Sequence, residues 1–214
     1  MPALVRRAER LAGRTLGWLA EQHGRVAPEH LRGHKGWVGD LLEAALGADA
    51  GSRDAPDFEG LGVELKTLPV DASAVPREST WVCTAVLDGS VSESWEASRV
   101  HRKLARVLWI PIVGDGVPAS RLVGAPVFWE PSPQDEAVLR RDWEELTEAI
   151  RLGHLDRLDA RMGEALQLRP KAANRTETTW MLDREGDWVE TGPRGFYLRR
   201  SFTSALMARS FGAG

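Results

Sequence analysis

The chain has 214 residues, of which 43% are apolar and 28% are charged. This composition excludes a fibrous, collagenous or disordered protein and predicts one globular domain, or one domain with two lobes. A chain of this length buries roughly 70% of the surface that it exposes when unfolded, so its core needs neither disulfides nor a structural metal.

The single cysteine and the amino-terminal residues indicate the cellular compartment. Cys83 lies in the apolar run WVCTAVL and is interpreted as a buried hydrophobe in a reducing environment. Residues 1–20 are charged within their first turns and hold no long apolar run. We therefore expect no signal peptide and no membrane span, and a cytoplasmic location.

The net charge of −3 is unevenly distributed along the chain. Residues 1–40 carry a net charge of +3, residues 41–98 carry −8, residues 99–150 carry −1, and residues 151–214 carry +3. If the basic ends face a phosphate backbone, the acidic segment must be held apart from it or neutralised by cations. A divalent-metal site would provide that neutralisation.

Hydrophobic spacing and turn residues predict a mixed α/β chain. Helices are expected over residues 3–21, over 37–46 with Gly47 as the end, over 133–152 with Ser132 as the cap, and from Phe202 with Ser201 as the cap. Strands are expected over 61–70, 80–87, 106–113 and 122–129, together in one mixed sheet, then over 165–170 and in a hairpin around 187–199. Because there is no repeat or polar linker, residues 1–214 are expected to form a single unit.

The chemistry is clearest in the run PDFEGLGVELKT at residues 56–67. Strand alternation places Glu64 and Lys66 on one face, and the spacing from Asp57 suits a strand, a tight turn and a return strand that bring the two carboxylates together. Two close carboxylates need a cation between them, and hard oxygen ligands suit Mg²⁺. Lys66 then stabilises charge on a reacting phosphate. The pattern indicates a phosphodiesterase site, although an acid and a base alternating on an exposed strand are equally compatible with simple solvation.

The run DFEGLGVELKTLPVD (57–71) resembles the active-site strands of the PD-(D/E)xK nuclease superfamily and, within it, the MutH family of methyl-directed mismatch-repair endonucleases. Further strings resemble other signatures of that family, namely KGWVGDLLEAALGADAGS (35–52), HRKLARVLWIP (101–111), RPKAAN (169–174) and RGFYLRRSFTSALMAR (194–209). The resemblance implies a restriction-endonuclease-like α/β fold, with a mixed β-sheet flanked by helices and two lobes around a DNA cleft. It places catalytic residues mainly in 35–111 and DNA-reading residues mainly in 165–205.

The resemblance implies a monomeric DNA repair enzyme. It would nick the unmethylated strand of double-stranded DNA at hemimethylated or unmethylated GATC sites by Mg²⁺-dependent hydrolysis, with Mn²⁺ as a substitute, after activation by MutL once MutS has found a mismatch. One alternative is a GATC-specific restriction endonuclease of the same superfamily, which needs two active sites, whereas this chain shows one catalytic string. Another alternative is a DNA-binding module without activity. The acids Asp57 and Glu64 argue against it, because carboxylates beside phosphate weaken binding.

The residues that the resemblance assigns to the catalytic centre are the metal ligands Asp57, Glu64 and the carbonyl of Leu65, and the catalytic lysine Lys66. The resemblance makes Glu43 an additional acid near the metal, whereas the residues alone allow a solvated helix glutamate. It makes Lys103 a second lysine that reaches the reacting phosphate. Without it, Lys103 belongs to an ordinary solvated basic stretch.

Reading bases requires donors and acceptors at the major-groove edge and cations for the phosphates. The residues that the resemblance assigns to GATC reading and to sensing the N6-methyl group of adenine are Arg169, Pro170, Lys171 and Tyr197. Proline stiffens the loop between the two cations. Tyr197 is also compatible with simple packing, and Arg199 and Arg200 are either phosphate contacts or solvated charges.

Several other residues have two interpretations. Trp81 stands where the family commonly has phenylalanine, and is either a wedge near DNA or a core residue. Lys35, before the glycine that opens the second helix, is a phosphate or loop contact. His30 and His34 have no third ligand at metal spacing, so a zinc site is not expected. The tryptophans that are expected in the core or at its rim are Trp95, Trp109, Trp129, Trp143, Trp180 and Trp188.

Overall fold

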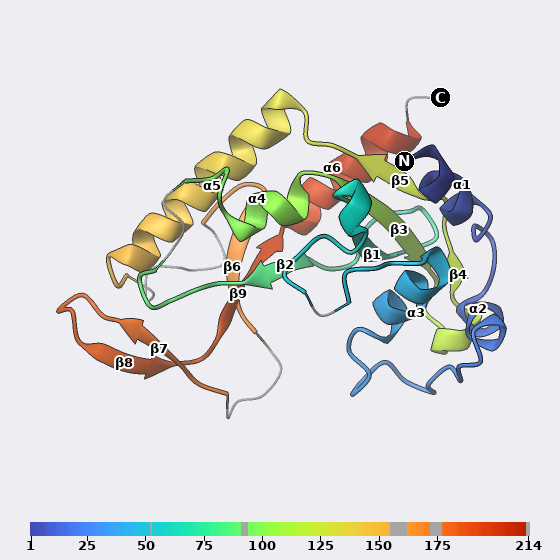
Figure 1. Cartoon of the computed structure of the whole chain (residues 1–214), viewed down its shortest axis with the longest axis horizontal. Coiled ribbons are helices and arrows are strands. Elements are labelled where there is room, and N and C mark those ends of the chain that lie inside the picture. The colour runs from blue at the N-terminus through green and yellow to red at the C-terminus, as the bar shows by residue number, and fades with distance from the viewer. Residues whose placement is uncertain (52, 91–93, 155–161, 172–176, 213–214) are drawn as a thin grey trace. The chain divides into compact units, whose positions relative to one another are not determined.

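A computed structural model of the chain describes residues 1–51, 53–90, 94–154, 162–171 and 177–212 (Figure 1). Over these residues, the α-helices are α1 (Pro2–Glu9), α2 (Leu16–Gln22), α3 (Trp37–Leu46), α4 (Arg99–Leu104), α5 (Pro133–Arg151) and α6 (Arg200–Phe211), and the short 3-10 helices are η1 (Glu59–Leu61) and η2 (Pro118–Ser120). The strands are β1 (Glu64–Val70), β2 (Thr80–Thr84), β3 (Val107–Val113), β4 (Leu122–Val123), β5 (Val127–Trp129), β6 (Leu166–Pro170), β7 (Thr179–Leu182), β8 (Trp188–Thr191) and β9 (Arg194–Leu198). The predicted mixed α/β class is confirmed.

The described strands form three sheets. In the first, β1 runs parallel to β3, and β4 and β5 pair antiparallel with the two ends of β3. In the second, β9 lies between β2 and β6 and is antiparallel to both. In the third, β7 and β8 form an antiparallel pair. The prediction that β2 joins β1 and β3 was wrong, because residue composition identifies a strand but its partner is set by contacts with distant parts of the chain.

The contacts divide the chain into two compact units. Unit 1 consists of Met1–Glu78, Ala105–Glu130 and Leu206–Gly214, and unit 2 consists of Ser79–Leu104 and Pro131–Ala205. The first sheet belongs to unit 1, and the other two sheets belong to unit 2. Each unit is therefore assembled from segments that are separated in the sequence.

The core of unit 1 combines α1, α2 and α3 with the apolar side chains of β1 and β3. Leu41, Leu42 and Leu46 of α3 are fully buried and share one face of that helix, as the sequence predicted. The expected helix over 37–46 is confirmed, and it ends at Gly47. Because α3 packs against β1, this helix supports the strand that holds the candidate catalytic pair.

The single helix predicted over residues 3–21 was wrong, because α1 and α2 are separate helices. Between them the backbone pairs with β4: Gly13 donates to the Val123 carbonyl at 2.8 Å, and the Val123 amide donates to the Arg14 carbonyl at 2.9 Å. Gly13 has a φ of 80°, a conformation that glycine adopts without strain. The Thr15 hydroxyl then accepts from the amide of Trp18 and starts α2.

The two carboxy-terminal helices follow the predicted pattern with one shift. The Ser132 hydroxyl accepts from the Asp135 amide at 3.1 Å, so the predicted cap of α5 is confirmed. The terminal helix begins at Arg200, before the predicted start at Phe202, because the Thr203 amide already donates to the Arg199 carbonyl at 3.1 Å. Of the helices that the structure describes, none combines the length and apolarity needed to cross a bilayer.

Two strand predictions near β3 and β9 were also wrong in detail. Residues 122–129 form two short strands, because the chain bends at Gly124, whose amide donates to the Pro111 carbonyl at 2.7 Å. The hairpin expected around 187–199 does not form, since β8 pairs with β7 and β9 pairs with β2 and β6. The turn of the actual hairpin is built by Asp183, whose carboxylate accepts from two later amides of the same turn.

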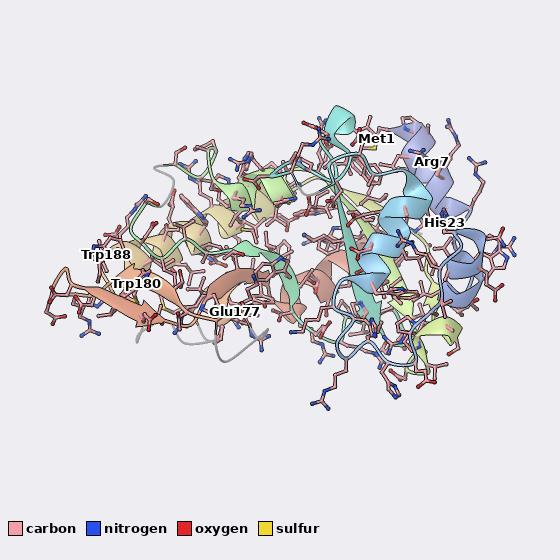
Figure 2. All side chains as sticks on the ribbon, turned by 60° about the horizontal axis from the view of Figure 1, so that its bottom comes forward. Met1, Arg7, His23, Glu177, Trp180 and Trp188 are labelled. Carbon is pink, nitrogen blue, oxygen red and sulfur yellow. The ribbon has the colours of Figure 1, made fainter. Side chains whose placement is uncertain are left out.

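The aromatic residues divide between core and surface. Cys83 is buried, as predicted, and so are four of the tryptophans, namely Trp95, Trp109, Trp129 and Trp143. Trp180 and Trp188 lie on the β7–β8 hairpin and are each 56% exposed (Figure 2). The expectation of a core position fails for these two residues, because a hairpin of two strands has few neighbours to cover its faces.

Asp142 of α5 anchors the start of β6 within unit 2. One oxygen of its buried carboxylate accepts hydrogen bonds from the amides of Glu164, Ala165 and Leu166, at 2.8, 2.6 and 2.9 Å. A carboxylate is suited to this position because it satisfies three backbone donors at once. The contact fixes where the strand begins.

Replacing Asp142 by alanine should therefore lower the free energy of unfolding by about 2–5 kcal/mol, because buried amides are left without an acceptor. Urea unfolding measures this loss. The matched control is Glu144→Ala on the same helix, which removes only an exposed ion pair with Arg140 and should cost less than about 1 kcal/mol. Equal unfolding midpoints for the two variants would contradict the anchoring role.

Candidate functional site

The centre of the candidate site is a buried ion pair on β1. Lys66 Nζ donates to Glu64 Oε1 at 3.1 Å, and the two residues are 7% and 5% exposed. The contact confirms that alternation places both side chains on the same face of the strand. The sequence suggested an exposed face, whereas the structure buries the pair, so its electrostatic interaction is stronger than in water.

Asp57 lies at the free edge of the same strand. Its Oδ2 accepts from the amide of Leu65 at 2.7 Å, on the side of β1 opposite β3. The expected turn and return are present, since Phe58 bridges Val63 and η1 makes the turn between them. The turn after α3 fixes the position of Asp57, because the amide of Asp49 in that turn donates to the backbone carbonyl of Asp57 at 3.0 Å.

The donor atoms of this edge suit a hard divalent cation. Asp57 and Glu64 supply carboxylates, and the Leu65 carbonyl projects from the same edge as the Leu65 amide, because both groups of a strand residue point to one side. Among the described residues, no three His, Cys, Asp or Glu side chains form a group that could hold a metal ion. Mg²⁺ commonly takes only one or two protein carboxylates and keeps several waters, so this set fits it.

Three other predicted residues lie on or beside helices α3 and α4. Glu43 is half-buried on α3, the helix that packs against β1. Lys35 is exposed just before the same helix. Lys103 is half-buried on α4, a short helix of unit 2 that the sequence did not predict and that ends shortly before β3. Their assignment to catalysis or to DNA contact stays a prediction.

A second cluster lies on one face of the sheet β2–β9–β6. It brings together the predicted residues Trp81, Arg169, Lys171 and Tyr197. Trp81 and Tyr197 are register partners, with ring centroids 5.1 Å apart and planes at 77°. We call these four residues the recognition face.

The two cations of the recognition face lie over its aromatic rings. The guanidinium carbon of Arg169 is 5.6 Å from the centroid of the Tyr197 ring, and Lys171 Nζ is 5.9 Å from the centroid of the Trp81 ring. Arg169 also donates to the Ser79 hydroxyl at 2.5 Å. These contacts hold two long side chains in defined positions over the rings.

The strand positions explain why Tyr197 presents its ring on this face. Its neighbours Phe196 and Leu198 are buried and alternate with it along the strand, and Tyr197 itself is half-buried. Pro170 ends β6 and is therefore part of a strand and not of a loop. Ala172 to Asn174 of the RPKAAN string, and Ser52, lie outside the described residues.

Sequence reasoning missed three features of this region. Ser79 was not identified as a partner of Arg169, and no local signal in the sequence points to it. Gly195 was overlooked, although a glycine inside a strand commonly marks a close approach of another group. The contact of Arg199 with the Met162 carbonyl was not predicted either; its side chain is half-buried and donates to that carbonyl at 2.8 Å.

Comparison with known proteins identifies the family of the chain. Residues 46–142 match the family model described as the DNA mismatch repair enzyme MutH. The chain is 52% identical over 210 residues to the DNA mismatch repair protein MutH of Serratia proteamaculans (strain 568) and to that of Escherichia coli O17:K52:H18, covering 97% of this chain and 92% of each relative. It is 51% identical to the protein of the same name from Enterobacter sp. (strain 638), covering 97% and 91%. The chain therefore belongs to the MutH family of DNA mismatch repair enzymes.

Proposed function

We propose that this protein is a mismatch-repair endonuclease that nicks the unmethylated strand of hemimethylated or unmethylated GATC sites by Mg²⁺-dependent hydrolysis. The observation that carries the proposal is the buried Glu64–Lys66 pair, with Asp57 at the adjacent strand edge, in a chain of the MutH family. The stability of the sheet does not require a buried acid and lysine, since apolar residues of similar volume stabilise a buried sheet at least as well.

Asp57, Glu64 and the Leu65 carbonyl would hold the metal. When bound, Mg²⁺ supplies charge neutralisation and lowers the pKa of a coordinated water, and Mn²⁺ has the coordination chemistry to replace it. Lys66 places its ammonium beside the reacting phosphate and stabilises the negative charge that grows as water attacks phosphorus and the bond to the leaving oxygen breaks. Glu43 and Lys103 are proposed as an additional acid and a second phosphate-binding lysine.

The recognition face is proposed to read GATC. Lysine and arginine donate to the acceptors of guanine, and Tyr197 meets the edge of adenine where the N6-methyl group stands. Lys35 contacts a backbone phosphate. A restriction endonuclease of the same superfamily is the second candidate, but a double-strand break requires two active sites, and a monomer with one catalytic string supplies one.

In the proposed pathway the enzyme acts as a monomer in the cytoplasm, where the bacterial chromosome lies. MutS finds the mismatch, and MutL activates nicking. Support for these partners is the family membership and the names of the relatives, which are mismatch repair proteins. A plasmid nicking assay with and without MutL, on unmethylated, hemimethylated and fully methylated DNA, tests the whole proposal.

The first prediction concerns the metal centre. Asp57→Ala should abolish nicking while binding to GATC DNA, measured without added metal, stays equal or becomes tighter, because removing a carboxylate relieves repulsion with phosphate. Plasmid nicking and a gel-shift titration give the two quantities. Binding that is lost in parallel with activity would show that Asp57 has another role.

A second prediction separates the catalytic role of Lys66 from its role in folding. Lys66→Met removes the ammonium group that pairs with the buried Glu64 carboxylate and should cost about 3–5 kcal/mol of stability, whereas the double variant Glu64→Gln/Lys66→Met should recover most of that loss. Neither variant should nick DNA. Thermal unfolding and plasmid nicking measure the two effects, and turnover in the stable double variant would remove both residues from the mechanism.

A third prediction separates base reading from phosphate contact among the basic residues of unit 2. Lys171→Ala should weaken binding to GATC by about 1–3 kcal/mol relative to a site with one changed base pair. Arg200→Ala, at the exposed start of α6, should weaken binding to all sequences alike and reduce the salt slope by about one. Titrations of DNA binding at several salt concentrations distinguish a sequence-specific loss of affinity from a general one. If Lys171→Ala weakened binding to all sequences and Arg200→Ala weakened binding to GATC alone, the two roles would be exchanged.

The fourth prediction concerns methyl sensing by Tyr197. Tyr197→Phe removes the hydroxyl but keeps the ring that contacts Trp81 and lies under Arg169. The preference for unmethylated over fully methylated GATC should fall about ten- to hundredfold, because a missed polar partner costs about 1–3 kcal/mol. Nicking rates on the two substrates provide the ratio. An unchanged ratio would place methyl sensing at Arg169 or Lys171.

A further inference from the structure

The ring of Trp81 occupies space that any side chain at position 195 would fill. A Cβ added to Gly195 would overlap Cζ3 of the indole, and it would lie 2.6 Å from Cη2 and 3.0 Å from the Cys83 carbonyl oxygen. Gly195 is itself buried at the centre of β9, between Thr84 of β2 and Arg169 of β6. The indole therefore lies across the middle strand because that strand carries no side chain there.

A change of register directs Trp81 toward this space. Trp81 pairs with Tyr197, whereas Cys83 already pairs with Phe196, so β2 contains an irregularity between Trp81 and Cys83. A β-bulge of this kind commonly re-aims a side chain. The bulge in β2 and the glycine in β9 together determine where the indole lies.

The position of the indole in turn determines the position of its neighbours on the recognition face. Lys171 Nζ lies over the Trp81 ring, and the Tyr197 ring meets the same indole edge-on. Arg169 lies over the other aromatic ring, that of Tyr197. The four side chains form one continuous set of contacts, and Trp81 is the member that touches both Lys171 and Tyr197.

We propose that Gly195 is a positioning residue for sequence recognition, which acts by leaving room for Trp81 to hold Lys171 and Tyr197 in place. This inference rests on the proposed reading of GATC by the recognition face. Gly195 itself has no side chain to contact DNA, so its contribution is made through the indole. Displacing the indole loosens the lysine and the tyrosine and leaves Asp57, Glu64 and Lys66 of unit 1 chemically intact.

The test compares nicking at GATC with nicking at a site that differs by one base pair, using the full-length protein with Mg²⁺. Gly195→Ala should reduce this preference at least about tenfold, the size of one lost specific contact. The matched control is Gly192→Ala, because an added Cβ at Gly192 meets nothing within 4 Å, and this variant should keep the wild-type preference.

A second substitution distinguishes positioning from general damage to the sheet. Trp81→Phe shortens the ring and removes the atoms that a Cβ at position 195 would overlap. The double variant Trp81→Phe/Gly195→Ala should therefore show a higher GATC preference than Gly195→Ala alone. A purely structural role predicts no such rescue, because the smaller ring removes packing contacts and adds to the damage.

Three results would overturn the inference. The first is a GATC preference of Gly195→Ala equal to that of the wild type. The second is a loss of GATC preference in Gly192→Ala as large as that in Gly195→Ala. The third is a GATC preference of the double variant no higher than that of Gly195→Ala. If Gly195→Ala does not fold, Trp81→Ala empties the same space and should reduce the preference equally, and an unchanged preference would overturn the inference. If the wild-type enzyme itself shows no preference for GATC, the proposed function fails. If the wild type shows the preference and the variants do not behave as expected, only the role of Gly195 fails.

Discussion

The buried pair of Glu64 and Lys66 constrains the rest of unit 1. Removing one partner of a buried ion pair is costly, because it takes away the charge that compensates the other in a medium of low dielectric constant. In the observed register of β1 against β3, Glu64 lies beside Val107 and Lys66 beside Trp109. A shift by one residue would turn both charges to the other face and exchange them with Leu65. The burial of the pair and the register of the sheet are thus linked.

Unit 2 uses cations in a different way. On β1 a carboxylate neutralises Lys66, whereas on the recognition face aromatic rings attract Lys171 and Arg169 without cancelling their charge. A cation held by a ring keeps its hydrogen-bond donors for an incoming acceptor, and the ring limits the conformations that must be lost on binding. Basic side chains are therefore paired with a carboxylate in one unit and with aromatic rings in the other.

The sequence predicted local features and missed those that depend on distant contacts. Periodicity and capping residues predicted α3 and α5, and strand alternation predicted that Glu64 and Lys66 share a face. Alternation gives the side of a strand but not its depth, so the burial of the pair was missed. The break at Gly13 and the pairing of β2 with β9 depend on partners far along the chain, which spacing does not reveal. The recognition face was assigned by family resemblance, and its mutual contacts emerged only in three dimensions.

The interleaving of the two units restricts how either unit can be replaced as a whole. The segment Ala105–Glu130 of unit 1 interrupts unit 2, and the helix α6 begins in one unit and ends in the other. No single cut in the chain separates the two units. In proteins built as consecutive domains one cut releases a folded module, whereas any cut in this chain divides at least one of its units. Neither unit can therefore be exchanged between relatives as one continuous stretch of sequence.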